Sequence, residues 1–471
     1  MNFTDFYKNN VVLLDGGFGT LLQSYGLGAG EKPERWNITH AEDVIKGHKA
    51  YYDAGSNVVS TNTFGANLLN FTRKELEEII PAAVQNAKMA REQSVGTQPK
   101  FIALDIGPSG RLVGPFGGFS FEDAVATFSE TVKLGVAAGV DLIIIETMND
   151  GYEAKAALIA AKENSDSPVF VSNAYGTGGR LMTGASPTVM ATIASGMGAS
   201  AVGANCSFGP KQLRPVMEEL LTVSSLPIIL KPNAGLPQNR NGVTTYDVTP
   251  EEFAEDVSAL LEKGVRIVGG CCGTTPSHIS ALAKKMGDRT PVSTPMKNEE
   301  PTVAASFCNT LTLSKPLTVG GALNTATPKG LAIFEGMDEY EVLDEALSMQ
   351  EEGIDLLLFA PDTANPDMEF IRAAVYELNA VIKAPLMLLS ENAEMIETVL
   401  RAYNGKAVLI FPQTEGAQKA AISAAKKYGA VIVGKVDGIT DSVSTEFQSL
   451  FGQGFSKADI LSELYVENIL I

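Results

Sequence analysis

The feature that most constrains the fold is a regular alternation of short apolar runs with longer stretches of helical periodicity. Before residue 290 the apolar runs lie at 11–14, 57–60, 101–104, 142–145, 169–171, 201–203, 227–230 and 265–268. The stretches between them, such as 121–138 and 250–263, repeat apolar residues at the spacing of one helix face. Eight strands separated by helices predict a (β/α)8 barrel, with a doubly wound open sheet as the alternative.

A second, shorter series of apolar runs follows residue 312. These runs lie at 317–319, 355–359, 385–389, 407–411 and 430–433, with helical stretches such as 339–352 and 368–378 between them. Five runs are too few for the usual eight-stranded barrel, so we expect 313–471 to be a smaller, incomplete parallel α/β domain. Its edge strands need covering by the tail, the first domain or another subunit. The proline-containing segment 291–312 predicts a linker, which gives the first domain the bounds 1–290.

Charge and hydropathy limit the partners and the compartment. The 471 residues include 55 acidic and 36 basic ones, a net charge of −19 that disfavours contact with nucleic acid. No apolar run reaches the roughly 20 residues that a membrane-spanning helix needs. The first ten residues lack the basic start and apolar stretch of a signal peptide. We therefore expect a cytoplasmic protein that binds neither nucleic acid nor membrane.

Three of the four cysteines follow expected strands in glycine-rich turns. Cys206 follows the sixth run, and Cys271 and Cys272 follow the eighth. Because all strands of such a barrel end at the same mouth, these sulfurs can meet despite their distance in sequence. Three thiolates would bind zinc and leave a fourth tetrahedral position open, as in catalytic zinc sites. A disulfide between Cys206 and one of the pair is the alternative, while Cys308 is expected to be an ordinary free cysteine.

A zinc ion with three thiolate ligands favours one kind of chemistry. It is poorly suited to producing hydroxide and well suited to binding a substrate thiol as a fourth thiolate. That thiol loses its proton on binding but keeps an electron-rich sulfur that can attack. The expected reaction is therefore alkyl transfer to sulfur.

Residues at other strand ends indicate that the thiol belongs to an amino acid. Asp15 and Glu146 each follow an apolar run and could accept hydrogen bonds from an ammonium group, although each could instead cap a helix. The backbone amides of Gly16, Gly17 and Phe18 could bind a carboxylate. An amino acid with a thiol would use all of these groups at once.

At these residues the sequence resembles the homocysteine S-methyltransferase family, in particular the homocysteine-binding module of cobalamin-dependent methionine synthase. The matching segments are DGGFGT at 15–20, TNTFGAN at 61–67, GANCSFGP at 203–210 and GGCCGTTP at 269–276. The resemblance implies that Cys206, Cys271 and Cys272 bind zinc.

The same resemblance assigns substrate contacts. It implies that Asp15 and Glu146 hold the amino group of homocysteine. Thr63 and Asn205, which lie inside the matching segments, become further expected substrate contacts.

The second domain resembles the start of the pterin-binding module that follows in methionine synthase, on the segments 400–407 and 425–430. Members of that group carry Asp and Asn at several strand ends to bind the pterin ring. The corresponding residues here are Leu358, Ala360, Leu389 and Phe411, and only Asn324 looks retained. The last strands and the cobalamin-binding and reactivation modules are missing. The resemblance therefore implies the acceptor half of a methyl transfer without the usual folate site.

These observations give one hypothesis and several alternatives. We expect a zinc-dependent enzyme that activates homocysteine as a zinc thiolate and methylates it to methionine. The methyl group would come from methylcobalamin on a separate corrinoid protein. The alternatives are a small onium donor such as betaine or S-methylmethionine, methyltetrahydrofolate as donor, or a non-catalytic assembly subunit. The truncated second domain could join two copies of the chain in a homo-oligomer.

Overall fold

All eight apolar runs of the first half form strands of one parallel sheet. The computed structural model describes residues 2–240, 243–287, 301–440, 447, 449, 450, 453 and 455–471. The strands are β1 (Val12–Leu13), β2 (Val58–Ser60), β3 (Phe101–Ile106), β4 (Leu142–Met148), β5 (Val169–Asn173), β6 (Ala201–Asn205), β7 (Ile228–Lys231) and β10 (Ile267–Val268). Their order is β1-β10-β7-β6-β5-β4-β3-β2, and every pairing is parallel. The predicted eight-stranded barrel is confirmed.

The seam between β1 and β2 is joined through Asn57. Its backbone N–H donates to the carbonyl of Leu13 at 2.7 Å, and its side-chain Oδ1 accepts from the N–H of Leu13 at 3.0 Å. The side-chain amide also donates to the carbonyl of Pro99. The hydrogen bonds of one buried asparagine therefore take the place of regular backbone pairing between β1 and β2 and close the barrel.

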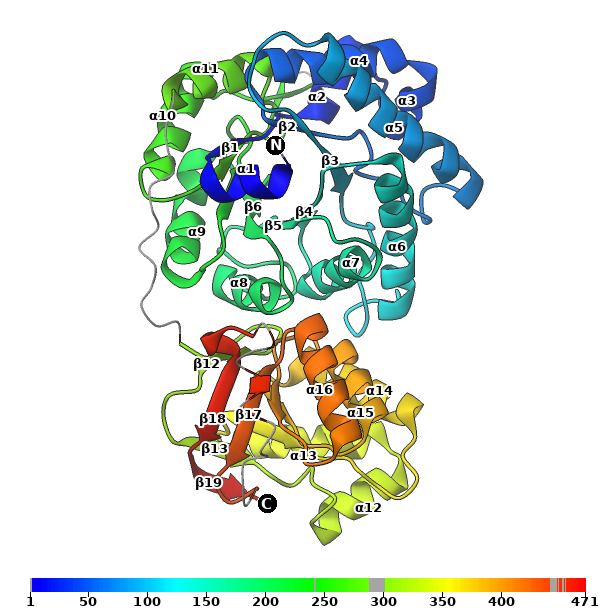
Figure 1. The fold of residues 1–471 in the computed structure, drawn as a ribbon, viewed down its shortest axis with the longest axis vertical. Helices are drawn as coiled ribbons and strands as arrows, with labels where there is room; N and C mark the ends of the chain where they lie inside the picture. The colour runs from blue at the N-terminus through cyan, green and yellow to red at the C-terminus, as the bar shows by residue number, and fades with distance from the viewer. Residues whose placement is uncertain are drawn as a thin grey trace. The chain divides into compact units, whose positions relative to one another are not determined.

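The helices between these strands surround the sheet. Apart from α8 (Pro187–Gly196), which is described below, they are α2 (Phe18–Tyr25), α3 (Trp36–Thr39), α4 (Ala41–Asp53), α5 (Arg73–Gln93), α6 (Phe121–Ala138), α7 (Gly151–Asn164), α9 (Pro210–Val223), α10 (Pro250–Leu261) and α11 (Pro276–Met286). Figure 1 shows the longer ones as a ring around the strands. Local signals fix their starts: Thr249 and Glu252 form a capping box at α10, with Pro250 in the first turn.

A short N-terminal helix, α1 (Phe3–Asn9), lies across one end of the barrel (Figure 1). Phe3 contacts Phe101 and Phe170 with ring centroids 5.0 Å and 5.6 Å apart, and Tyr7 contacts Phe170 at 5.5 Å. Phe101 is the first residue of β3, so α1 covers the amino ends of the strands. The carboxyl ends face the opposite mouth, where chemistry is found in this fold.

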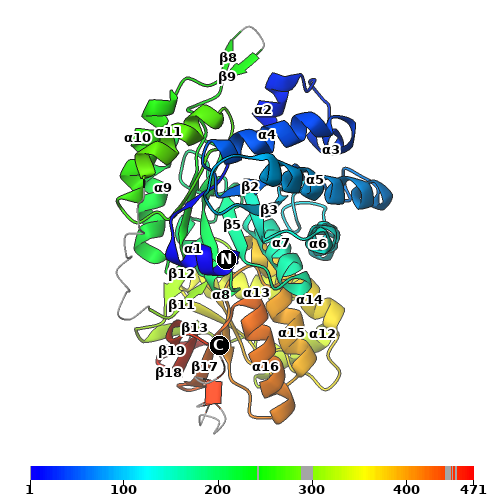
Figure 2. The same ribbon diagram turned by 45° about the horizontal axis from the view of Figure 1, so that its top comes forward.

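A hairpin that the sequence did not indicate follows β7. It consists of β8 (Gln238–Arg240) and β9 (Val243–Thr245), which pair antiparallel, and Figure 2 shows it projecting from the barrel beyond α10 and α11. The hairpin leads into Tyr246, which returns to the strand ends.

Contacts divide the chain into two units whose sequence bounds are interleaved. The first holds Met1–Arg111, Glu122–Met182 and Ala199–Met296, and the second holds Leu112–Phe121, Thr183–Gly198 and Lys297–Ile471. Helix α8 (Pro187–Gly196) therefore groups with the second unit. Part of the expected linker 291–312 lies outside the described residues. Its end forms the antiparallel hairpin of β11 (Val303–Ala305) and β12 (Thr310–Thr312).

The second unit is a parallel α/β partial barrel with more strands than the sequence indicated. The five expected runs form β13 (Leu317–Gly320), β14 (Leu356–Phe359), β15 (Leu386–Leu388), β16 (Val408–Ile410) and β17 (Val431–Val436). Helices α12 (Pro328–Gly336), α13 (Glu339–Glu351), α14 (Met368–Val381), α15 (Ala393–Ala402) and α16 (Glu415–Tyr428) connect them. Two further strands, β18 (Ile460–Leu464) and β19 (Val466–Leu470), make the sheet seven-stranded, so the expectation of only five strands was wrong.

The C-terminal strands cover both edges of that sheet. β18 pairs parallel with β17, and β19 pairs parallel with β13 at the other edge. Only Tyr465 separates the two strands, and its carbonyl accepts from the N–H of Leu317 at 3.1 Å. One extended segment of the tail therefore satisfies the backbone of both edge strands, which is one of the covers expected from the sequence.

The carboxyl ends of the second sheet are apolar or tied to one another. Leu358, Ala360 and Phe411 are buried in the second unit, at 1%, 4% and 1% exposure. The Asp362 carboxylate accepts from the hydroxyl of Ser390 at 2.6 Å, which links two of the loops. None of the helices among the described residues is long and apolar enough to span a membrane.

Candidate active site

The three cysteines predicted as metal ligands meet at the mouth of the first barrel. The sulfurs of Cys206, Cys271 and Cys272 all lie within 4.8 Å of one another, and none is in a disulfide. A tetrahedral metal with metal–sulfur bonds of about 2.3 Å holds its sulfurs about 3.8 Å apart. The cluster can therefore hold a metal ion, and the alternative of a disulfide is not found. Cys308, in the second unit, is not in a disulfide either.

The loop after β7 fixes the backbone of the cysteines from a central position. β7 lies between β6 and β10, so its carboxyl end faces both cysteine turns. The N–H of Cys206 donates to the carbonyl of Lys231, and the N–H of Cys271 donates to that of Pro232 at 2.8 Å. The carbonyl of Cys272 accepts from Ala234 at 3.0 Å. One turn of chain therefore positions all three sulfurs.

Backbone conformation also explains the residues around the cysteines. Cys206 and Ser207 both have positive φ, 59° and 57°, an uncommon conformation outside glycine that is often found at functional sites. A side chain on Gly17 would place its Cβ 2.6 Å from the carbonyl oxygen of Cys271. Because Gly17 has no side chain, the loop after β1 can approach the cysteine pair closely.

The acids predicted to bind an ammonium group are already paired with a lysine. Lys231 Nζ lies 2.6 Å from Glu146 Oε2 and 3.7 Å from Asp15 Oδ1, and all three side chains are buried. Asp15 Oδ2 also accepts from the N–H of Ser60 at 2.7 Å. Neither acid caps a helix. Sequence analysis assigned no role to Lys231, although it is the last residue of β7 and lies at the same mouth of the barrel as the cysteines.

Burial and charge shift the ionisation of this group. Burial raises the pKa of Asp15 to about 6, against the opposing effects of Lys231 and Ser60. Burial alone lowers the pKa of Lys231, but the charges of Glu146, Asp15 and Asp105 raise it above its ordinary value. Lys231 therefore stays an ammonium group inside the barrel.

A further buried acid, Asp105, stands near the end of β3. It is 7% exposed, and its Oδ1 has no hydrogen bond. Burial, followed by the charge of Glu146, raises the pKa of Asp105 well above its ordinary value. Sequence analysis gave Asp105 no role.

Hydrogen bonds among the three thiols shift their pKa values. Hydrogen bonds from Cys271 and Cys272 lower the pKa of Cys206 to about 3, against the effect of burial. The hydrogen bond to Cys206 raises the pKa of Cys271 well above its ordinary value. Hydrogen bonds among the three thiols therefore shift the pKa values of Cys206 and Cys271 in opposite directions.

Tyr246 and Asn233 add hydrogen bonds to the sulfurs. Tyr246 interacts with Cys272, and the side chain of Asn233 interacts with Cys206 and lowers its pKa. Gly273, at φ 78°, leaves room for Tyr246, whose ring carbon would lie 2.2 Å from a Cβ there. Tyr246 follows a polar hairpin with no periodic pattern, so nothing in the sequence pointed to it.

Asn205 lies behind the cysteines and supports them. Its Oδ1 accepts from the N–H of Thr147 and the hydroxyl of Ser172, both at 2.8 Å. Its Nδ2 donates to Thr147 Oγ1 at 2.7 Å and lies 3.9 Å from Cys271 Sγ. Both the oxygen and the nitrogen of the side-chain amide therefore have hydrogen-bond partners within the protein.

Thr63 is also engaged within the protein. Its hydroxyl donates to the carbonyl of Asp105 at 2.8 Å and lies 2.7 Å from Thr61 Oγ1. Neither Thr63 nor Asn205 is among the residues that line the cavity described next.

A cavity of about 320 Å³ connects the cysteines with the acids. A space of this size accepts a small molecule. The residues that line it include Asp15, Gly16, Gly17, Phe18, Glu34, Asp105, Glu146, Thr147, Cys206, Lys231, Cys271 and Cys272. Most of the residues that sequence analysis assigned to the site therefore share one cavity.

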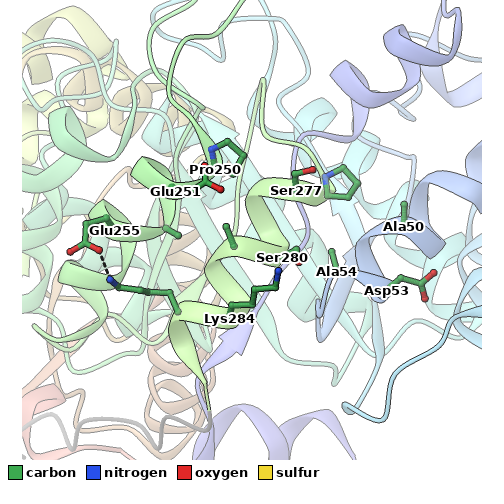
Figure 3. Close-up of a pocket in the computed structure, with 13 residues that line it drawn as sticks. Ala50, Asp53, Ala54, Pro250, Glu251, Glu255, Ser277, Ser280 and Lys284 are labelled. Atoms are coloured by element: carbon green, nitrogen blue, oxygen red, sulfur yellow. Dashed lines mark hydrogen bonds and ion pairs between the residues drawn. The ribbon is translucent and has the colours of Figure 1, made fainter.

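A larger and more open hollow of about 970 Å³ lies elsewhere, on the outer helices α4, α10 and α11 (Figure 3). Its charged groups include Asp53, Glu251 and Lys284, and Glu255 pairs with Lys285. None of the residues predicted for the site lines it. The cysteine cavity is therefore the candidate active site.

Solved structures with a similar fold are homocysteine methyltransferases. MmuM from Escherichia coli in its oxidized form is 22% identical, with a TM-score of 0.52, over 58% of this chain and 96% of MmuM. Its metallated form is also 22% identical, with a TM-score of 0.52, over 60% of this chain and 99% of MmuM. At this identity the likeness concerns the fold of the barrel.

The family assignment comes from the sequence comparison. The family model described as homocysteine S-methyltransferase matches residues 12–286, more than half of the chain. The match includes the complete strand series of the barrel and all three clustered cysteines. The chain therefore belongs to the homocysteine S-methyltransferase family.

Proposed function

We propose that this chain is a zinc-dependent methyltransferase that converts homocysteine to methionine. The observation that carries the proposal is the cluster of three cysteine sulfurs opening into a cavity lined by buried acids. Thiolate ligands favour zinc among the common metals of proteins. The structure similar to this barrel that is described as metallated supports a metal in the family's fold.

The residues of the cavity match the three groups of homocysteine. Zinc bound by three cysteines would supply an open position that takes the substrate thiol and favours its ionised form. The acid cluster around Asp15 and Glu146 attracts the ammonium group. The first amides of α2, from Phe18 onward, lack partners within the helix and suit the carboxylate. Gly17 contributes less directly because its N–H already donates to Thr274 Oγ1 at 2.9 Å.

These groups would hold the thiol in place for methyl transfer. The thiol proton leaves to solvent, the sulfur forms a bond to the methyl carbon, and the bond from that carbon to the donor breaks. Cys206, Cys271 and Cys272 contribute as metal ligands, and the hydrogen bonds from Tyr246 and Asn233 temper the charge on two of their sulfurs. Because these ligands must be reduced thiols, the proposal places the protein in the cytoplasm.

We further propose that the methyl group arrives on a separate methylated corrinoid protein. Leu358, Ala360 and Phe411 stand at strand ends of the second unit, where a pterin site would need polar groups, and all three are buried. Asn324 uses its Oδ1 to accept from the N–H of Ala326. These contacts argue against methyltetrahydrofolate as the bound donor.

The donor is tested by supplying each candidate to the zinc-loaded chain with homocysteine and measuring methionine. We expect turnover with a methylated corrinoid protein and none with betaine, S-methylmethionine or methyltetrahydrofolate. Turnover with betaine or S-methylmethionine would replace the corrinoid by an onium donor. Absence of methionine with every donor, despite bound zinc and bound homocysteine, would favour a non-catalytic assembly role.

A further inference from the structure

The acid cluster of the cavity contains one member whose interactions are unexplained. Asp15 and Glu146 both have Lys231 as an internal cation. Oδ1 of Asp105 is buried and has no hydrogen bond with any described residue, although Asp105 lines the same cavity. A buried polar atom without a partner is rare in a folded protein and often marks a position where a ligand binds.

The backbone of Asp105 is held firmly while its side chain is left unbound. Thr61 Oγ1 accepts from the N–H of Asp105 at 3.2 Å, and the hydroxyl of Thr63 donates to its carbonyl at 2.8 Å. The residue is 7% exposed, so water gives its carboxyl little compensation. Protonation alone does not satisfy the group, because it would add an O–H donor that also needs an acceptor.

The charges in the cavity indicate which ligand group would satisfy Asp105. Lys231 carries one positive charge against the two negative charges of Asp15 and Glu146, so these three leave the cavity negative. A ligand ammonium group brings the missing positive charge and can donate three hydrogen bonds. Two acids of the cavity, Asp105 and Glu34, are not paired with Lys231, and Glu34 Oε1 already accepts from the N–H of Gly65 at 2.7 Å.

We propose that Asp105 binds the ammonium group of the substrate and selects amino-acid thiols over thiols that lack an amino group. Lys231 is then a positioning residue, which fixes Asp15 and Glu146 and prevents the cavity from accumulating three unpaired carboxylates. This inference rests on the proposed function, because it concerns the same thiol site.

The test compares two thiols that differ only in the amino group. Homocysteine and 4-mercaptobutanoate have the same thiol, chain length and carboxylate. Their dissociation constants are measured by calorimetric titration of the zinc-loaded full chain, in the wild type and in Asp105→Asn. We expect the wild type to prefer homocysteine, and the variant to bind it about 10- to 100-fold more weakly, as for the loss of one charge-assisted hydrogen bond. Binding of 4-mercaptobutanoate should be unchanged or tighter.

Glu153→Gln is the matched control. Glu153 is another buried acid, 1% exposed, that does not line the cavity, so its neutralisation should leave both dissociation constants unchanged. Zinc content and circular dichroism confirm that each variant is folded. If Asp105→Asn does not fold, Asp105→Ser removes the same charge with a smaller polar side chain. The wild-type ratio of the two affinities needs no variant, and a ratio near one would overturn the proposal.

The outcomes separate this proposal from the function on which it rests. If the wild type and Asp105→Asn bind homocysteine equally well, Asp105 has no role in ammonium binding, whereas the proposed function stands. If the zinc-loaded wild type binds neither thiol, both proposals fail. A loss confined to homocysteine in Asp105→Asn supports both.

Discussion

At the residue scale, the site depends on interactions that hold its sulfurs and acids in place. The cysteines could be predicted from the sequence because the ends of the sixth and eighth strands must share one mouth in a barrel. The pairing of Lys231 with Asp15 and Glu146 could not, because it depends on side-chain directions that strand spacing does not encode. Thr63 and Asn205 were expected to touch substrate. Their side chains instead form hydrogen bonds within the protein, which indicates that they support the residues of the cavity wall.

Tyr246 offers a test of support around the metal ligands. Its interaction with Cys272 should stabilise the bound-metal form of that sulfur. We predict that Tyr246→Phe weakens zinc affinity by roughly tenfold, the usual effect of losing an outer hydrogen bond at a metal site. Competition with a chromophoric chelator measures this directly. Tyr340→Phe, at an exposed tyrosine of the second unit, should leave the affinity unchanged. Equal affinity in Tyr246→Phe and the wild type would show that Tyr246 is only a packing residue.

Glu153 predicts a pH dependence of stability. Burial raises its pKa to about 7 from an ordinary value of 4.5, although Ser109 N–H donates to its Oε1 at 2.7 Å. Between these two values the folded protein binds more protons than the unfolded chain, so the contribution of Glu153 to stability falls as the pH rises from about 4.5 to 7. This contribution is present below pH 4.5 and is lost through pH 7.

The corresponding variant is Glu153→Gln, which cannot ionise. Its free energy of unfolding, measured by urea titration at several pH values, should fall less steeply than that of the wild type between pH 5 and 8. The difference is of the order of a few kcal/mol at most. Parallel pH profiles for the two proteins would contradict the assignment.

At the element scale, some strands could be predicted from the sequence and others could not. The eight strands of the barrel are apolar runs because parallel strands inside a ring of helices are buried on both faces. β18 and β19 escaped prediction because polar residues, among them Glu463 and Glu467, interrupt their apolar residues. The β8–β9 hairpin escaped because it is short and polar. Sequence periodicity therefore identified the elements that build the core and missed those at the margins.

Removal of the tail strands tests their role at the sheet edges. A chain that ends at residue 459 would leave β13 and β17 with unpaired backbone groups. We predict that this truncation makes the protein aggregate, as measured by light scattering during size-exclusion chromatography. Glu467→Gln, at an exposed position of β19, should elute as the wild type does. A truncated protein that behaves like the wild type would show that the edges need no cover.

At the scale of the whole molecule, the two units carry unequal amounts of recognisable chemistry. The barrel unites three clustered cysteines, a buried acid group and a helix N-terminus in one cavity. The second unit has apolar residues at the corresponding strand ends, and its loops bind one another. On the proposed function, the first unit carries the acceptor half of the methyl transfer, and the proposed methyl donor is a separate corrinoid protein.

The most direct test of this account is whether homocysteine methylation depends on the cysteine cluster through zinc. The measurement is zinc content per chain together with the rate of methionine formation from the methylated corrinoid protein, for the wild type, Cys271→Ser and Cys308→Ser. We predict about one zinc per chain and turnover in the wild type and Cys308→Ser, with both lost in Cys271→Ser. Full turnover by a metal-free preparation, or by Cys271→Ser, would contradict the account.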